Sequence, residues 1–145
     1  METVRDVLAH KGGKVVSVSP ENTVFEALSV MAAENIGAVV VLDDAGGIAG
    51  ILSERDYARK VILIGKSSKD TAVSEIMTRQ VVVIGPHNTV EEAMALMSEK
   101  RCRHLPVVDG GRLCGIISIG DVVRAVIHDK DILISQLEHY ISGSL

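Results

Sequence analysis

The chain contains an internal repeat. Segment 15–43 reads VVSVSPENTVFEALSVMAAENIGAVVVLD, and segment 81–109 reads VVVIGPHNTVEEAMALMSEKRCRHLPVVD. After the turns that follow, GILSERD at 50–56 is answered by GIISIGD at 115–121. A repeat of this kind predicts two related structural copies. We therefore expect two related sites about a pseudo-twofold axis rather than one active site.

The size and composition of the chain favour one globular core that both copies share. The chain has 145 residues, and a copy of about 60 residues would be only marginally stable alone. Hydrophobic residues make up 47% and charged residues 23%, as in globular proteins. One Phe and no Trp predict an aliphatic core. The net charge of −4 argues against nonspecific nucleic-acid binding, which needs a concentrated basic face.

Each copy is predicted to run strand, helix, strand, strand, helix. The capping boxes Thr23-x-x-Glu26 and Thr89-x-x-Glu92 start the first helix of each copy, and apolar residues spaced i, i+3, i+4, i+7 give that helix one buried stripe. β-branched or continuous apolar runs predict the strands, and glycine-rich turns join the second strand to the third. The predicted strands are 15–18, 38–42, 48–52, 81–84, 104–108 and 113–117. The predicted later helices are 54–64, 119–127 and 129–141.

A short lead-in precedes the first strand of each copy. Segment 4–8 (VRDVL) matches segment 73–77 (VSEIM) in pattern, although the first copy then carries a few extra residues before its strand. The resulting layout has four parts. They are a first motif at 1–66, a linker and lead-in helix at 67–77, a second motif at 78–130 and a C-terminal helix at 131–145.

A Ser-x-x-Asp motif recurs where the third strand of each copy meets the next helix, as Ser53 to Asp56 and Ser118 to Asp121. One interpretation is purely structural, because a Ser at the N-cap with an acidic residue three positions on is a capping box. The other is functional. A helix N-terminus can bind phosphate, and a nearby carboxylate can accept hydrogen bonds from a ribose diol. The residues alone leave both interpretations open.

Both copies resemble CBS motifs, and together they resemble a CBS-pair, or Bateman, module over about residues 3–130. Segment 53–60 (SERDYARK) is similar to that of the small stand-alone CBS-pair proteins of bacteria and plant organelles. The resemblance implies an α+β fold of two tandem CBS motifs, each β-α-β-β-α, packed as a pseudo-twofold pair around one core. The matching motifs are the two lead-ins, Pro-x-Asn-Thr-Val-x-Glu-Ala at 20–27 and 86–93, RHLPVVD at 103–109, and the doubled Gly-Ile-(Leu/Ile)-Ser-x-x-Asp.

The resemblance also implies a regulatory, energy- or redox-sensing module that binds AMP, ADP or ATP, and in some members NAD(H) or S-adenosylmethionine. In the family, each site lies between the copies and joins the Ser-x-x-Asp of one copy to the lead-in and middle strand of the other. By position, Asp56 and Asp121 should hold ribose hydroxyls, while Ser53 and Ser118 should reach phosphate. The positions beside adenine are Val16, Ile36, Gly37 and Ala38 in one site, and Thr78, Val82, Cys102, Arg103 and His104 in the other.

The two sites are expected to differ in affinity or ligand. Arg55 lies inside the first Ser-x-x-Asp, whereas Gly120 takes that place in the second. Arg103 and His104 offer the second copy phosphate donors that the first copy lacks. A solvated charge at a strand end and a packed strand histidine are the alternatives for Arg103 and His104.

No catalytic residues are predicted. The chain has no P-loop, no nucleophile elbow and no G-x-G-x-x-G after a strand, so we expect a binding module rather than an enzyme. The histidines do not cluster with carboxylates at metal-ligand spacing, so no metal site is expected. Cys102 and Cys114 lack a CxxC or CxxH spacing. They are read as buried thiols, with a redox contact as the alternative.

The output of such a module must pass to a separate partner, whose identity the sequence does not give. A homodimer is expected through apolar helix faces that could equally be core within one copy. With no signal peptide or membrane-length apolar run expected, the predicted location is the cytoplasm. The competing hypothesis is a structural dimerisation module with vestigial ligand sites. The residues of the two apolar faces are Val122, Val123, Val126 and Ile127, and Tyr57, Ala58, Val61 and Ile62.

Overall fold

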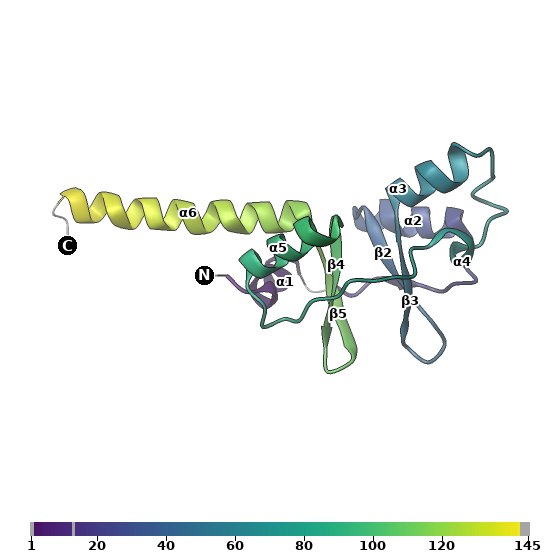
Figure 1. Cartoon of the computed structure of the whole chain (residues 1–145), viewed down its shortest axis with the longest axis horizontal. Coiled ribbons are helices and arrows are strands. Elements are labelled where there is room, and N and C mark those ends of the chain that lie inside the picture. Colours follow the sequence, from purple (N-terminus) through teal and green to yellow (C-terminus); the bar gives the residue numbers. More distant parts are fainter. Residues whose placement is uncertain (1, 13, 143–145) are drawn as a thin grey trace. The chain divides into compact units, whose positions relative to one another are not determined.

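The computed structural model describes residues 2–12 and 14–142, which fold into two compact units (Figure 1). Unit 2 is the continuous segment Val15–Val82, and unit 1 combines the described residues of 1–14 with those of 83–145. Each unit contains a small sheet and several helices, so the predicted α+β class is confirmed. The units are described one at a time below.

Unit 2 is built on a three-stranded sheet in the order β1-β2-β3. β1 (Ser17–Val18) pairs in parallel with β2 (Ala38–Leu42), which pairs antiparallel with β3 (Ile48–Ser53). β2 is the central strand, and its first four residues are buried, as its continuous apolar run predicts. The helical elements are α2 (Val24–Glu34), α3 (Glu54–Tyr57), the π-helical turn η1 (Ala58–Ile62) and α4 (Val73–Ile76).

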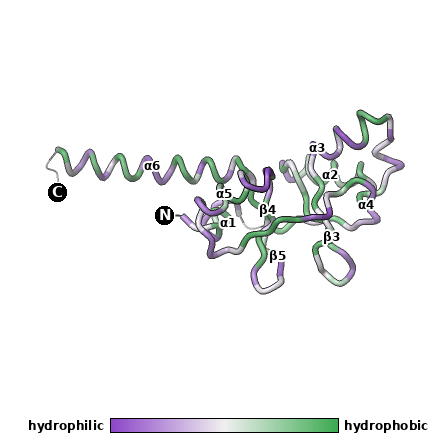
Figure 2. Tube along the Cα trace, viewed as in Figure 1, coloured by the Kyte–Doolittle hydropathy of each residue, from purple (hydrophilic) through white to green (hydrophobic). Residues whose placement is uncertain are grey.

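Unit 1 is built on the hairpin of β4 (His104–Asp109) and β5 (Arg112–Ser118). Gly110 and Gly111 form its two-residue turn with φ of 57° and 82°, the left-handed values that a type I′ hairpin turn needs. In the described part of unit 1, the helices beside the hairpin are α1 (Val4–Lys11), α5 (Val90–Lys100) and α6 (Ile119–Ser142). Figure 2 shows the hydrophobic residues concentrated on the strands and recurring along the helices.

Each unit takes its lead-in helix from the other sequence copy. α1 precedes the first copy but joins unit 1, where Val4 N donates to Asn88 O at 2.8 Å. α4 precedes the second copy but joins unit 2, where Val73 N donates to Asn22 O at 2.8 Å. The two bridges Thr3↔Thr89 and Thr23↔Ala72 repeat this arrangement. The lead-ins therefore exchange, and the compact units do not coincide with the repeats as read along the chain.

The capping boxes predicted at Thr23 and Thr89 are confirmed: each threonine accepts from the backbone N–H three residues on, and the glutamate there accepts from the threonine N–H. Several expected elements differ. The strand expected at 15–18 is only Ser17–Val18, and the helix expected at 54–64 is α3 followed by the π-helical turn η1. Residues 143–145 of the expected C-terminal helix lie outside the described residues. Segment 81–84 forms only the single bridge Ile84↔Val107 rather than a strand, and Val83 is left 44% exposed. The separate helices expected at 119–127 and 129–141 form one continuous helix, α6, because no Gly or Pro interrupts the chain between them.

Candidate functional site

The first Ser-x-x-Asp forms a capping box at the junction of β3 and α3. Ser53 N donates to Asp56 Oδ2 at 3.0 Å, and Asp56 N donates to Ser53 Oγ at 3.2 Å. The structural interpretation of this motif is therefore correct. It accounts for only one carboxylate oxygen, however, and Oδ1 of Asp56 takes no part in the cap.

Oδ1 of Asp56 faces two donors from elsewhere in unit 2. Lys60 Nζ lies 3.2 Å away, and Thr78 Oγ1 lies 3.4 Å away. Thr78 reaches this position because its backbone pairs with Ile51 of β3 in both directions, at 3.0 and 2.9 Å. Lys60 is held by a second bond from its ammonium to Ile76 O at 2.9 Å. The Asp56 side chain is 14% exposed, so this carboxylate is enclosed but still accessible.

The second Ser-x-x-Asp repeats the cap at the junction of β5 and α6. Ser118 N donates to Asp121 Oδ2 at 2.8 Å, and Asp121 N donates to Ser118 Oγ at 3.2 Å. The Asp121 side chain is 7% exposed, so it is more deeply buried than Asp56. A buried carboxylate of this kind needs charged or hydrogen-bonding partners to remain ionised.

Two cations provide those partners. Lys11 Nζ lies 2.8 Å from Asp121 Oδ2, and Arg124 Nη2 donates to Oδ1 at 2.7 Å. Burial is the largest single influence on the pKa of Asp121 and raises it, but the hydrogen bonds from Lys11 and Ser118 and the positive charge of Lys11 together outweigh it. The pKa of Asp121 is therefore held below its usual value, and the group is ionised at neutral pH.

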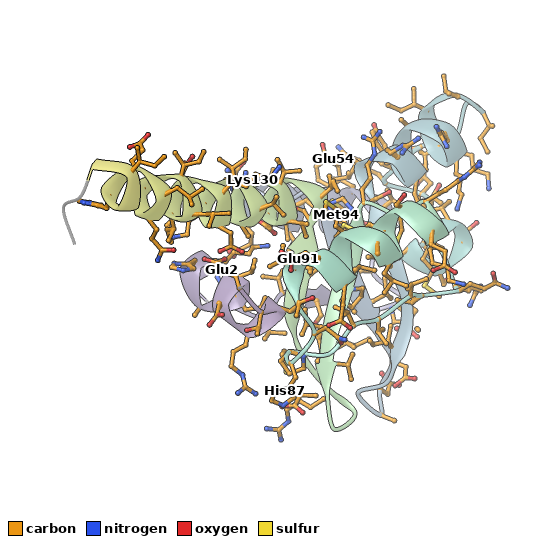
Figure 3. All side chains as sticks on the ribbon, turned by 60° about the vertical axis from the view of Figure 1, so that its left-hand side comes forward. Glu2, Glu54, His87, Glu91, Met94 and Lys130 are labelled. Atoms are coloured by element: carbon orange, nitrogen blue, oxygen red, sulfur yellow. The ribbon has the colours of Figure 1, made fainter. Side chains whose placement is uncertain are left out.

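Asp121, Lys11 and Arg124 line a cavity of about 510 Å³ in unit 1. It lies between α1 and α6, where Glu2 (labelled in Figure 3) donates through its backbone N–H to Asp129 Oδ2 at 3.3 Å. Its lining includes one buried carboxylate, several cationic or titratable groups and some apolar surface. The remaining lining residues are Glu2, Val7, His10, Ala125 and His128.

The start of each middle strand lies beside the Ser of its own copy. Gly37 O accepts from Glu54 N at 3.1 Å, and Ala38 pairs with Ser53. In unit 1, Arg103 O accepts from Ile119 N at 2.8 Å, and His104 pairs with Ser118. Within unit 2, then, Gly37 and Ala38 lie on the same strand edge as the first motif. Within unit 1, Arg103 and His104 lie beside the second.

The other residues expected at the sites lie as follows. Val16 and Ile36 are half-buried against the core of unit 2, and Val82 is half-buried. Arg55 is exposed on α3. Cys102 and Cys114 are half-buried rather than the buried thiols expected from the sequence. Burial raises the pKa of the Cys102 thiol, which keeps it protonated and less reactive at neutral pH. The ligand roles of these residues, and the expected joining of sites between copies, remain predictions.

Sequence reasoning missed Lys11. Thr78 follows the second lead-in directly and lies near Asp56, but the first lead-in is followed by the extra residues 10–14. Those residues have no counterpart in the other copy, so alignment of the repeats assigns Lys11 no role. The exchange of lead-ins could have identified Lys11. Once the first lead-in is assigned to unit 1, a residue that directly follows this lead-in is expected to lie near Asp121.

Neither a metal cluster nor a membrane span is found in the part of the chain that the structure describes. Across residues 2–12 and 14–142, no three His, Cys, Asp or Glu side chains gather in a way that could hold a metal ion. No helix among the same residues combines the length and apolar character needed to cross a bilayer.

Comparison with known proteins gives consistent matches. The family model described as CBS domain matches residues 4–63 and 73–128. The mitochondrial CBS domain-containing protein CBSX3 of Arabidopsis thaliana is 40% identical, over 97% of this chain and 72% of the relative. The CBS domain-containing protein YhcV of Bacillus subtilis is 36% identical, over 84% of each chain. The crystal structure of a CBS-domain containing protein from Agrobacterium tumefaciens aligns with a TM-score of 0.79 at 45% identity, over 85% of this chain and 92% of that one.

Proposed function

This chain belongs to the CBS domain family, and we propose that it senses an adenine nucleotide and signals to a separate partner protein. Members of the family generally act as regulatory modules that bind adenosine ligands rather than as catalysts. AMP, ADP or ATP is the ligand that the charges of its sites favour. NAD(H) and S-adenosylmethionine are the other adenosine ligands to be compared. The observation that carries the proposal is the grouping of Asp121, Lys11 and Arg124 around one cavity.

This grouping suits a ligand that carries both a diol and a phosphate. An ionised carboxylate only accepts hydrogen bonds, so Asp121 can bind the ribose hydroxyls as donors. Lys11 and Arg124 only donate, so they can bind phosphate oxygens, with Arg124 able to do so through two N–H groups. In the free protein Lys11 and Arg124 are both paired with the Asp121 carboxylate. A nucleotide offers each of them a replacement partner.

Asp56 offers a related but weaker set in unit 2. Its Oδ1 faces Lys60 and Thr78, and among the residues that the structure describes no arginine is bonded to this carboxylate as Arg124 is to Asp121. One cation in place of two favours a ligand with less negative charge, or lower affinity for the same ligand. This difference in bound cations supports the expectation that the two sites are unequal. It adds to the difference between Arg55 and Gly120 inside the two motifs.

Regulation requires that the ligand bind one conformation of the module more tightly than another. We propose a homodimer that presents this change to its partner through exposed apolar side chains. The structure divides the expected apolar faces: Val122 and Val61 are buried in their own units, whereas Val123, Ile127 and Ile62 are exposed. The cytoplasm remains the predicted location, although the plant relative is named as mitochondrial.

One observation favours the competing proposal, a structural module with vestigial sites. Both carboxylates are already bonded within their own units, and a capping box alone explains the Ser-x-x-Asp motif in each copy. The two proposals differ in what the second carboxylate oxygen and the cations are for. Ligand binding decides between them.

A thermal-shift screen of AMP, ADP, ATP, NAD(H), S-adenosylmethionine and adenosine tests the proposal. A ligand at 100 times its dissociation constant should stabilise the fold by about 2.7 kcal/mol. We expect stabilisation by phosphorylated adenosine ligands and little by adenosine alone. No stabilisation by any of them would favour the structural module.

Substitutions of the two carboxylates locate the binding. Asp121→Ala and Asp56→Ala each remove the proposed ribose acceptor together with a capping box. Glu92→Ala and Glu26→Ala are the matched controls, because each removes a capping box of the same kind elsewhere in the same unit. Binding should be lost in the Asp variants and retained in the Glu variants. Binding that survives both Asp changes would show that the ribose assignment is wrong.

A further inference from the structure

The C-terminal half of α6 is not covered by any other described residues of its own unit. α6 runs from Ile119 to Ser142, whereas the second CBS match ends at residue 128. Every side chain from Lys130 to His139 is exposed, and Figure 1 shows this part of the helix extending beyond α1 and α5. An isolated helix as short as this projecting half of α6 is only marginally stable in water. Its length and its exposed apolar residues therefore call for a packing partner.

Five of the exposed apolar residues of α6 follow a coiled-coil spacing, whereas Ile119, Ile132 and Leu133 are exposed outside it. Successive positions alternate by four and three residues, which is the 3.5-residue period of a helix seam. The single polar position is Lys130, labelled in Figure 3. We call these six residues the α6 seam. With their exposed fractions where given, they are Val123 (44%), Ile127 (53%), Lys130, Ile134 (52%), Leu137 (52%) and Ile141 (82%).

We propose that the α6 seam pairs antiparallel with the same seam of a second copy. The inference rests on the proposed homodimer and assigns it an interface, which extends beyond the segment that the family model matches. The pairing covers the five exposed apolar residues of the seam. It also gives the projecting helix the tertiary support that it lacks in one chain.

Charge favours the antiparallel orientation over the parallel one. A parallel pair in register would place Lys130 against the partner's Lys130 inside the seam. In the antiparallel pair centred near residue 132, Lys130 instead faces the partner's Ile134 and lies near the partner's Asp131. The same register brings the exposed Arg124 toward the partner's Glu138. Charged residues that flank a seam, and one polar residue within it, are known determinants of orientation.

The charges of the helix argue against a lipid surface as the occupant. Residues 129–142 contain three carboxylates, Asp129, Asp131 and Glu138, and only one lysine. Helices that lie on membranes carry Lys and Arg on the polar face. A second copy matches the apolar spacing and the charge pattern together.

Two substitutions at one exposed position test the orientation. In the antiparallel pair, Ile134→Glu places a glutamate opposite the partner's Lys130, whereas Ile134→Lys places lysine opposite lysine. Light scattering at several concentrations should give wild-type chain at twice 15.5 kDa. We expect the dimer dissociation constant of Ile134→Glu to stay within about tenfold of wild type, and that of Ile134→Lys to rise at least about a hundredfold.

The possible outcomes distinguish failure of the antiparallel pairing from failure of the homodimer. Equal weakening by both substitutions would overturn the antiparallel orientation, and a dimer unaffected by either would overturn pairing through α6 while leaving the homodimer in place. A mass of 15.5 kDa for the wild-type chain would overturn both the α6 pairing and the homodimer. The same holds if that monomer sediments with phosphatidylcholine vesicles, because a lipid surface would then be the occupant of the seam. Circular dichroism verifies that both variants fold. Calorimetric titration with ATP tests the nucleotide proposal independently, because residue 134 does not line the cavity.

Discussion

At the scale of single residues, Lys11 is the main cause of the lowered pKa of Asp121, since its hydrogen bond is the largest of the influences that lower that pKa. Lys11→Met removes the ammonium and keeps much of the apolar stem. We expect the pKa of Asp121 to rise, because burial then acts against fewer compensating donors. Carboxyl NMR titration measures the change. Arg5→Met, on the same helix, is the charge-matched control and should leave that pKa unchanged.

The lowered pKa of Asp121 also predicts a pH dependence of stability. A carboxyl whose folded pKa lies below its unfolded pKa contributes stability above the unfolded value, about pH 4, and loses it as pH falls through the folded value. Asp121→Asn should therefore be less stable than wild type by about 1 to 3 kcal/mol at neutral pH. Urea unfolding should show that this difference shrinks below about pH 4. A stability difference that stays constant down to about pH 2.5 would contradict the presence of an ionised, buried carboxylate at residue 121.

At the scale of elements, two glycines should respond in opposite ways to substitution by alanine. Gly50 precedes the first Ser-x-x-Asp motif, and Gly120 lies inside the second. A Cβ on Gly50 would lie 2.8 Å from Met77 Sδ and from the backbone oxygen of Thr78, so β3 and the segment after α4 would have to separate. Gly50→Ala should destabilise unit 2 by about 1 to 3 kcal/mol. Gly120 in α6 meets nothing closer than 3.4 Å, and Gly120→Ala should stabilise unit 1 by up to about 1 kcal/mol.

Chemical denaturation of both variants measures these effects. Gly50→Ala would displace Thr78, which donates to Asp56, so it should also weaken the binding of any ligand at Asp56. Equal stability changes in the two variants would argue against a specific close approach at Gly50.

The elements show where sequence reasoning succeeds and where it stops. Capping boxes at Thr23, Thr89 and Ser53 could be predicted because their hydrogen bonds are local, between residues three apart. One of the two cations beside Asp121 could not, because Lys11 is 110 residues away along the chain and becomes a neighbour only through the exchanged lead-in. Segment 81–84 has strand-forming residues but pairs at only one of them, since partner geometry rather than propensity decides pairing.

At the scale of the whole molecule, the exchanged lead-ins predict which fragments fold. Fragment 15–82 contains all of unit 2, including the buried Val73, Ile76 and Met77 of its core. Fragment 1–66 follows the sequence motif but lacks those residues. We expect only 15–82 to unfold cooperatively in a circular-dichroism melt, with marginal stability because of its size. A cooperative melt of fragment 1–66 as well would mean that α4 is not needed by unit 2.

Asp56 and Asp121 are proposed to bind an adenine nucleotide. Calorimetric titration of ATP and AMP into wild type, Asp56→Ala/Asp121→Ala and the control Glu26→Ala/Glu92→Ala tests this proposal most directly. We expect two unequal binding events in wild type and in the control, and none in the Asp variant. Two identical sites would contradict the proposed inequality. Binding that is unchanged in the Asp variant, or absent from wild type, would contradict the claim itself.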